Sequence, residues 1–314
     1  MPDTFVSVII PCFNEEEVIE STYSRLKKVV SNHYKRYELI FINDGSKDKT
    51  LTLLEKIAIK DKAVKVLSFS RNFGHQAAVS AGIHNAKGDV AVIIDADLQD
   101  PPELIPDMVN IYIKEKCNVV YGVRKERKGE SFFKKITAKL FYRFLNSLSD
   151  VSIPLDTGDF RLIDRKVIDT FNSLREKNKY IRGLVSWIGF KQKPFYYTRE
   201  ARFAGVTKYP LAKMIKFATT GLLYFTKKPL KIAMTLGFLS ILVGIGLSIY
   251  TFIERFTNRI ETVPGWASLV ISIVFFGGVQ LLTIGVLGEY IGSIFDEVKD
   301  RPEYIIDRKI NVKQ

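Results

Sequence analysis

Residues 90–102 read VAVIIDADLQDPP, and this stretch decides the expected fold. Its first five residues are apolar and mostly β-branched, which predicts a buried strand. Asp95 and Asp97 follow directly, and residues two apart in an extended chain point the same way. Adjacent carboxylates repel unless a cation joins them, so the pattern indicates Mg²⁺ or Mn²⁺ bound together with a substrate phosphate. The alternative is a solvated acidic loop.

The composition suits a protein that contacts phosphates or an anionic membrane. The chain has 314 residues, a formal net charge of +13 and 46% hydrophobic residues, enough for more than one domain. No zinc-finger spacing, RNP motif or long Lys/Arg block is present, so no nucleic-acid partner is expected. Cys12 and Cys117 lie far apart, which predicts free thiols in a reducing compartment. The N-terminal residues 1–11 indicate a first strand and not a signal peptide.

Strand and helix patterns alternate through the first part of the chain, which predicts an α/β fold with a doubly wound, mostly parallel sheet. Ligands of such sheets bind beyond the carboxyl ends of the strands. The expected strands are residues 5–11, 37–43, 64–68, 90–94 and 119–123. Polar residues gather after them: Asn14, Glu15, Asp44, Ser46, Arg71, Asn72, Asp95 and Asp97.

The segment 131–147 lies in a basic stretch with apolar residues at helical spacing. This pattern favours an amphipathic helix on an anionic membrane surface, although a core-facing helix with a solvated basic back has the same pattern. Residues 211–230 repeat the theme and are expected to form a juxtamembrane amphipathic helix, which favours the membrane.

Two apolar segments predict transmembrane helices at about 232–253 and 266–290, within a membrane region 231–292. Lysines precede the first span, so the positive-inside tendency places the catalytic domain and both termini in the cytoplasm. The linker 254–265 is then external, and residues 293–314 form a cytoplasmic tail. A multi-pass protein of the cell (inner) membrane is expected.

Four motifs occur in the order that resembles glycosyltransferase family 2. They are FVSVIIPCFNEE at 5–16, NDGS at 43–46, DAD with Gln99 at 95–99, and GDFR at 158–161. Together with the spans, they resemble the polyprenyl-phosphate glycosyltransferases, such as dolichyl-phosphate mannose synthases and bactoprenyl-phosphate glucosyltransferases. The resemblance implies a GT-A fold over residues 1–210 that transfers one sugar from a nucleotide sugar to a lipid phosphate.

The resemblance also implies a donor site. Asp44 would contact the base, although an Asp–Gly turn explains it equally well. Arg71 and Asn72 would help form the pocket or serve only as loop residues. The implied donor residues are Pro11, Phe13, Glu15, Asp44, Asp95, Ala96, Asp97, Gln99 and Arg124, with Asp95, Asp97 and Gln99 at the divalent cation.

Similar synthases bind phosphates with basic residues at such positions. The resemblance therefore implies that Arg124, Arg202 and Lys208 bind the donor or acceptor phosphates, unless Arg202 and Lys208 lie in a solvated basic loop. Asp156 and Asp159 are candidates for the catalytic carboxylate, with Asp97 at the departing nucleotide. A phosphate acceptor has a second pKa of about 6 and is largely ionised near neutral pH. We therefore expect Asp159 or Asp156 to orient the acceptor or complete the metal site as much as to remove a proton.

The resemblance and the acidic motif together imply an inverting, metal-dependent hexosyltransferase. Its donor would be UDP-glucose and its acceptor polyprenyl (undecaprenyl) phosphate. Transfer from UDP-4-formamido-arabinose or GDP-mannose is the nearest alternative, and a homo-oligomer is allowed. A processive synthase lacks support because no QxxRW motif occurs. A non-catalytic sensor of nucleotide sugars and a helix pair that forms a transport path are the remaining alternatives.

Overall fold

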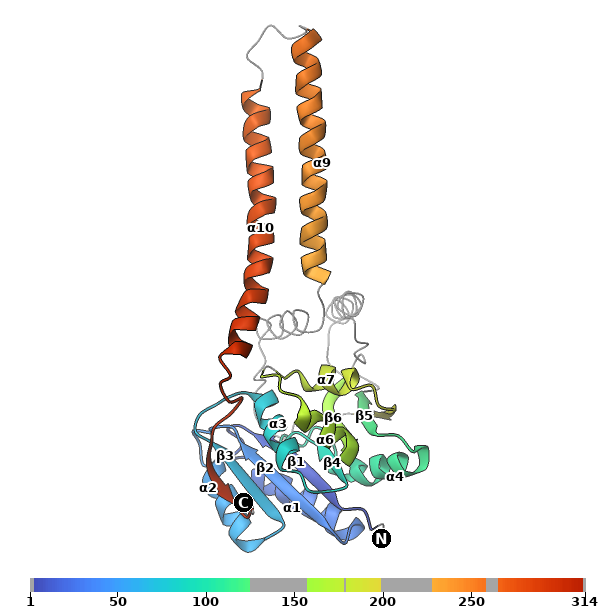
Figure 1. Ribbon diagram of the computed structural model, residues 1–314. Helices are drawn as coiled ribbons and strands as arrows, with labels where there is room; N and C mark the ends of the chain where they lie inside the picture. The colour runs from blue at the N-terminus through green and yellow to red at the C-terminus, as the bar shows by residue number, and fades with distance from the viewer. Residues whose placement is uncertain (1–2, 125–156, 178, 199–227, 258–264, 313–314) are drawn as a thin grey trace. The chain divides into compact units, whose positions relative to one another are not determined.

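The computed structural model describes residues 3–124, 157–177, 179–198, 228–257 and 265–312 (Figure 1). They divide into two compact units. One unit holds a mixed sheet with its helices and includes the C-terminal residues from Arg301 onward. The other holds two long helices. The expected helices at 131–147 and 211–230 lie in or reach into segments outside the described residues, so they stay predictions.

The sheet has eight strands in the order β7-β5-β6-β4-β1-β2-β3-β8. The strands are β1 (Val6–Cys12), β2 (Tyr37–Asn43), β3 (Val64–Phe69), β4 (Val90–Ile93), β5 (Val119–Arg124), β6 (Thr157–Asp164), β7 (Gln192–Tyr197) and β8 (Ile306–Ile310). The five strands expected from the sequence are present with bounds that differ by one residue at most at each end. The central strands β1 and β4 are buried on both faces, which explains their continuous apolar runs.

Helices cover both faces of this sheet. They are α1 (Ile19–His33), α2 (Thr50–Lys60), α3 (His75–Asn85), the 3₁₀ turn η1 (Pro102–Leu104), α4 (Ile105–Glu115), α6 (Arg165–Ser173) and α7 (Ile181–Trp187). Val8 and Ile10 of β1 belong to the core cluster that includes apolar residues of α1, α2 and α4. Ile9 points to the opposite face, where a Cβ on Gly82 of α3 would collide with it. The alternation of β1 therefore serves two helix layers.

The sheet is mixed but mostly parallel, as expected: four of its neighbouring strand pairs are parallel and three are antiparallel. Strand β6 lies between β4 and β5 and runs antiparallel to both, while β5 pairs with β7 in parallel. The β-α-β rule that predicts parallel neighbours applies to strands joined by a crossover helix. It does not determine the direction of β6, which follows the long connection after Arg124. As a consequence, the first residues of β6 lie at the carboxyl end of β4.

Residues 293–314 do not form one simple tail. Helix α10 continues to Val298, and β8 then pairs antiparallel with β3 at the sheet edge. Asn311 Nδ2 extends this attachment by donating to the carbonyl oxygens of Ala58 and Val64 at 2.7 and 2.9 Å. The five residues of β8, IDRKI, are too short and too charged to predict an edge strand from alternation alone.

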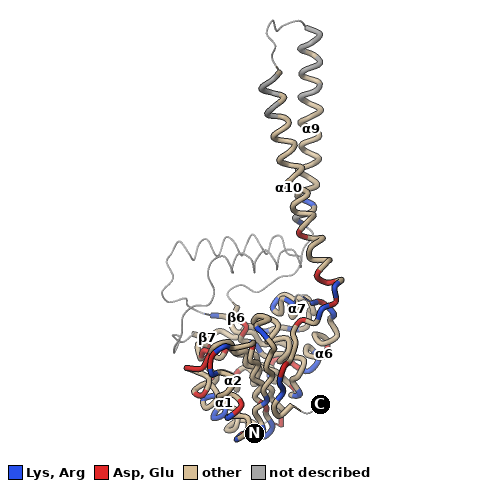
Figure 2. Tube along the Cα trace, turned by 90° about the vertical axis from the view of Figure 1, so that its left-hand side faces the viewer, with Lys and Arg blue, Asp and Glu red and all other residues tan. Residues whose placement is uncertain are grey.

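The second unit contains α9 (Lys228–Thr257) and α10 (Trp266–Val298), which pack on each other. A Cβ on Gly244 of α9 would lie 3.2 Å from the ring of Phe276 on α10, so this glycine allows close packing. The pair exposes large apolar side chains, and Figure 2 shows few charged residues along its described length. Within the described residues, Ser272–Val298 alone is long and apolar enough to cross a membrane, with a shorter apolar stretch at Leu230–Gly246.

Candidate functional site

Two loops after β1 and β2 bind each other through reciprocal hydrogen bonds. The backbone amide of Asn14 donates to Ser46 Oγ at 2.9 Å, and the amide of Lys47 donates to Asn14 Oδ1 at 2.9 Å. Asn14 adopts a left-handed conformation with φ of 52°, which asparagine tolerates better than most residues. This interlock fixes the candidate nucleotide loop that contains Phe13 and Glu15.

Asp44 is buried and holds the loop that leads into α3. Its carboxylate accepts hydrogen bonds from the Phe73 amide at 2.7 Å, the Gly74 amide at 3.0 Å and Asn72 Nδ2 at 2.9 Å. Burial raises the pKa of Asp44, and these backbone bonds act against that rise. Asp44 therefore has a structural role beyond that of a turn residue, because it organises residues 72–74. Its contact with a base stays a prediction.

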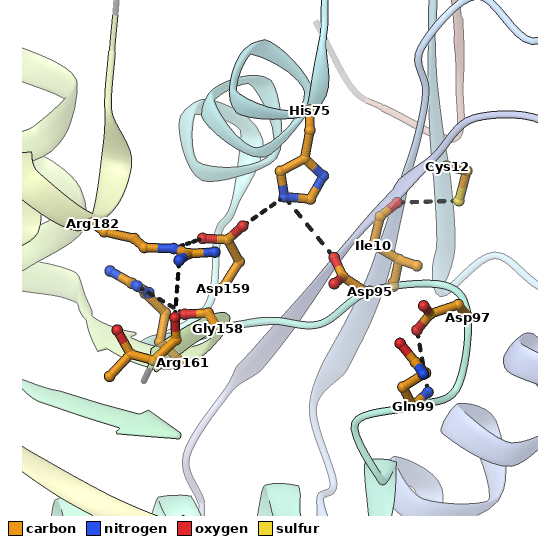
Figure 3. Close-up of polar contacts among 11 residues, drawn as sticks. Ile10, Cys12, His75, Asp95, Asp97, Gln99, Gly158, Asp159, Arg161 and Arg182 are labelled. Carbon is orange, nitrogen blue, oxygen red and sulfur yellow. Dashed lines mark hydrogen bonds and ion pairs between the residues drawn. The ribbon is translucent and has the colours of Figure 1, made fainter. Parts of the chain in front are cut away.

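The acidic stretch differs in detail from the expected extended geometry. Strand β4 ends at Ile93, and the chain turns at Ala96 and Asp97. Asp97 Oδ1 accepts a hydrogen bond of 3.2 Å from the Gln99 amide, whereas Asp95 points towards His75 (Figure 3). The expected alternation of Asp95 and Asp97 along one strand is therefore wrong. The two carboxylates are presented by a turn that the hydroxyl of Thr22 anchors at the Ala96 carbonyl oxygen, at 2.7 Å.

The antiparallel strand β6 brings Asp159 to Asp95. Ile93 pairs with Arg161, so the same register extended by two residues sets Asp95 opposite Asp159. Two cations flank Asp159 from opposite sides (Figure 3). His75 Nε2 lies 2.9 Å from Asp159 Oδ2, and Arg182 Nε donates to Asp159 Oδ1 at 2.7 Å.

Charge coupling within this cluster sets the protonation of its members. Burial raises the pKa of Asp159, but Arg182 and His75 outweigh burial and hold that pKa well below its usual range. Burial lowers the pKa of His75, yet the hydrogen bond and charge of Asp159, together with Asp95, raise it to about 9. Near neutral pH the cluster therefore contains an ionised Asp159 next to an imidazolium.

Asp95 carries the opposite perturbation. Burial raises its pKa, the charge of His75 lowers it, and the carboxylates of Asp100, Asp159 and Asp97 raise it again, to about 6. This excess of negative charge at the carboxyl end of β4 favours a bound cation.

The site can supply part of the coordination of a divalent cation. Among the residues that the structure describes, no group of three or more His, Cys, Asp or Glu forms a ready-made metal cage. Asp95 and Asp97 offer carboxylate oxygens, and Mg²⁺ is typically held by one or two carboxylates with water and substrate phosphates. Asp95 and Asp97 therefore fit a cation that the phosphates of the donor complete, with Gln99 as the further candidate.

Arg124 lies next to the same cluster, at the end of β5. A Cβ on Gly158 would lie 2.5 Å from a terminal nitrogen of Arg124, so the glycine makes room for the guanidinium. Tyr197 donates to Asp100 Oδ1 at 2.5 Å, and the charge of Asp100 raises the pKa of Arg124 against the effect of burial. The buried Nε of Arg124 has no hydrogen-bond partner within the described part of the chain.

The structure therefore couples Asp95 electrostatically with Asp97 and Asp159 and ties Asp44 to the loop before α3. Arg124 lies against Gly158, next to Asp159, and the Gln99 backbone amide donates to Asp97. Pro11 lies in β1, and Phe13 and Glu15 follow that strand. Three predicted residues, Asp156, Arg202 and Lys208, fall outside the described residues.

Sequence reasoning missed four residues of this site: His75, Arg182, Asp100 and Tyr197. The sequence offered a signal for His75, one of three histidines in the chain, since it follows the glycine that ends the loop after β3. Asp100 lies in the acidic stretch but received no role. Nothing in the local sequence marks Arg182 or Tyr197, which reach the site through β6, α7 and β7.

Two family models match the chain. The model for glycosyl transferase family 2 matches residues 7–171, and the model for the GtrB C-terminal hairpin matches residues 228–294. The first range runs from β1 through most of α6 and leaves out β7 and β8, and the second covers nearly all of α9 and α10.

Similar proteins extend over nearly the whole chain. An uncharacterized glycosyltransferase of Bacillus subtilis (strain 168), YkcC, is 50% identical over 98% of this chain and 94% of its own. The SfII prophage-derived bactoprenol glucosyl transferase of Shigella flexneri is 39% identical over 96% of this chain and 97% of its own.

Among solved structures, glucosyl-3-phosphoglycerate synthase from Mycobacterium tuberculosis, in complex with Mn²⁺, UDP-glucose and phosphoglyceric acid, is 23% identical with a TM-score of 0.46. The similarity covers 70% of this chain and 78% of that one. The family model and the full-length relatives confirm the resemblance drawn from the four motifs. The chain belongs to glycosyl transferase family 2.

Proposed function

We propose that this glycosyltransferase transfers a single glucose from UDP-glucose to polyprenyl phosphate at the cytoplasmic face of the membrane, with inversion at the anomeric carbon. Full-length similarity to bactoprenol glucosyl transferases supports the sugar and the lipid acceptor. One observation in the structure supports the proposal most directly. Asp95 of the acidic stretch lies opposite Asp159, and Asp159 is held by two cations, His75 and Arg182.

The donor would lie beyond the carboxyl ends of β1, β2 and β4. Asn14 and Asp44 hold the loops that would border the nucleotide, and Pro11, Phe13 and Glu15 would line them. Asp95 and Asp97, with Gln99, would hold Mg²⁺ or Mn²⁺. A divalent cation there supplies charge neutralisation of the departing diphosphate. Arg124 would add bidentate hydrogen bonds to the same phosphates.

Asp159 suits an orienting role better than that of a general base. A general base works best when its pKa is near the operating pH, whereas Arg182 and His75 hold the pKa of Asp159 well below its usual range. The phosphate acceptor is largely ionised near neutral pH and needs no base to remove a proton. Asp159 would then keep His75 and Arg182 in place as positive groups that face the incoming phosphate.

The remaining predicted residues complete this proposal. Arg202 and Lys208 would bind the acceptor phosphate, and Asp156 would assist Asp159. The basic amphipathic segments at 131–147 and 211–230 would hold the catalytic domain against anionic lipid. Helices α9 and α10 would both span the membrane, with both termini cytoplasmic.

Two other functions compete with this proposal. Transfer from UDP-4-formamido-arabinose or GDP-mannose would use the same acidic turn, because no described contact selects the sugar hydroxyls. A non-catalytic sensor would bind the nucleotide sugar without releasing UDP. The coupling of Asp95 to three carboxylates favours an enzyme, since such perturbed groups concentrate at catalytic sites.

A labelled-donor assay tests the proposal. The purified full-length chain, in detergent with polyprenyl phosphate, receives labelled UDP-glucose, UDP-4-formamido-arabinose or GDP-mannose, with Mg²⁺ or with a chelator. We expect label in the extracted lipid only with UDP-glucose and Mg²⁺, and a loss of at least about 100-fold in Asp97→Asn. The exposed Arg308→Ala serves as the matched control. Lipid-linked label from another donor would reassign the sugar, and none from any donor would refute the transferase proposal.

A further inference from the structure

A carboxylate from the C-terminal end of the chain is buried in the catalytic unit. Glu303 accepts a hydrogen bond from Ser80 Oγ at 2.8 Å and lies 3.8 Å from Lys179 Nζ. The Glu303 side chain is 13% exposed and that of Lys179 is 4% exposed. Ser80 is fully buried. Burial of this kind is uncommon for a glutamate and a lysine unless the pair has a structural or functional task.

The two partners of Glu303 belong to the elements that carry the cations of the site. Ser80 lies in α3, whose first residue is His75. Lys179 precedes α7, which carries Arg182. Glu303 therefore connects the helix that presents His75 with the segment that presents Arg182.

A second contact joins the same two elements. The Ile181 amide at the start of α7 donates to Gln76 Oε1 at the start of α3, at 3.0 Å. Two contacts thus set the spacing between α3 and α7. The bond of Gln76 lies at the start of α3, next to His75, and the contact of Ser80 with Glu303 lies about one helical turn further along α3. A shift of either helix would move one of the two cations that contact Asp159.

The segment around Glu303 is itself firmly attached. The ring of Tyr304 stacks on Phe69 with centroids 5.0 Å apart, and its hydroxyl lies 3.0 Å from His84 Nδ1 on α3. The Ser70 amide donates to the Ile305 carbonyl oxygen at 3.0 Å, immediately before β8. These contacts fix the backbone immediately after Glu303.

We propose that Glu303 is a positioning residue for sugar transfer: it clamps α3 to the start of α7 and so holds His75 and Arg182 on Asp159. The proposal rests on the transferase function given above. In the sequence, Glu303 follows α10 by a few residues. The segment after the second long helix therefore completes the geometry of the catalytic unit.

Kinetics of clamp variants provide the first test. At about pH 8, Glu303→Ala and Lys179→Met should lower kcat by about 10- to 100-fold, the scale expected when catalytic groups are misplaced. The KM for UDP-glucose should change less than about twofold, because the donor loops are held by Asn14 and Asp44. Glu303→Gln retains a group that can bond to Ser80 and should lose less kcat. Arg308→Ala, on β8 and paired with Glu55 at 3.1 Å, is the matched control.

A spectroscopic readout separates positioning from general destabilisation and does not depend on turnover. The chain has three histidines, so side-chain ¹⁵N signals of the histidine-labelled full chain in detergent can be assigned with His33→Gln and His84→Gln. We expect the His75 signals to shift in Glu303→Ala and Lys179→Met but not in Arg308→Ala.

The two proposals fail in different ways. If the wild-type chain transfers no sugar, the transferase proposal fails, while the His75 signals still decide the role of Glu303. Unchanged His75 signals in folded Glu303→Ala, or an equal shift in Arg308→Ala, would overturn the clamp. A change in KM with kcat preserved would also overturn it.

Discussion

His75 Nε2 lies 2.9 Å from Asp159 Oδ2, and this contact joins the start of α3 to the start of β6. His75 contacts one oxygen of the buried Asp159 carboxylate, and Arg182 contacts the other. Asp95 lies 3.9 Å from the same His75 nitrogen. The His75 imidazolium thus lies close to both Asp95 and Asp159, so the acidic turn and Asp159 are electrostatically linked.

Replacement of His75 tests this link. His75→Ala removes one cation from Asp159 and the positive charge of His75 from Asp95, so both carboxylates become more costly to keep ionised. We expect kcat to fall by about 10- to 100-fold, the range of a lost charged group in a catalytic site. His33→Ala is the control, because His33 Nδ1 lies 2.8 Å from the Val29 carbonyl oxygen of its own helix, α1. Equal activity of the two variants would contradict the link.

Gly158 tests the contribution of Arg124. A methyl group at Gly158 would lie 2.5 Å from the end of the Arg124 side chain, which can move without disturbing the backbone. We expect Gly158→Ala to raise the KM for the nucleotide sugar about tenfold, because the guanidinium no longer reaches the diphosphate, with little change in Tm. A large fall in Tm with an unchanged KM would show that the glycine is needed only for packing.

Gly45 tests how tightly the loop after β2 packs against residues 71–72. Its φ is 63°, and a Cβ would lie 2.5 Å from the Asn72 backbone nitrogen. Gly45→Ala should destabilise the protein by about 1–3 kcal/mol through backbone strain and should also displace residues 71–72. Thermal unfolding measures this loss. Gly285→Ala is the comparison, since among the described residues no atom beyond its chain neighbours and its own helix backbone lies within 4 Å of its Cβ position, and it should leave Tm nearly unchanged.

Glu303 gives the chain a pH dependence of stability. Burial raises its pKa from 4.5 to about 7, against the opposing effects of Ser80, Lys179 and Lys177. The folded state binds this proton more tightly than the unfolded chain does. The stability from this group is therefore full below about pH 4.5 and is lost as pH rises through about 7.

We accordingly expect the Tm of the wild type to fall relative to that of Glu303→Gln between about pH 5 and about pH 8. Burial lowers the pKa of the neighbouring His84 to about 4, so His84 stays uncharged over this interval. Parallel Tm curves for the two proteins would show that Glu303 keeps an ordinary pKa.

The parts of the fold that depend on local pattern were predictable from the sequence. Residues 37–43 form β2 as expected, and the strand expected at 64–68 is β3 at Val64–Phe69. The periodicity of apolar residues predicts buried strands and amphipathic helices. The family resemblance then placed Asp95, Asp97 and Asp159 in one site before any contact between them was known.

The remaining features depend on pairing between distant segments, which periodicity does not encode. The approach of Asp159 to Asp95 follows from the antiparallel direction of β6. The roles of Arg182 and Glu303 follow from tertiary contacts of α7 and of the segment before β8. Local sequence also missed the turn at Ala96, because an apolar run predicts a strand without fixing the residue at which it ends.

The pairing of β8 with β3 sets an order in which the sheet can be completed during synthesis. Val66 pairs with Ile310, so the edge of β3 stays uncovered until both long apolar helices have left the ribosome. An uncovered strand edge recruits other chains and promotes aggregation. The catalytic sheet therefore gains its last strand only after both long helices have been synthesised.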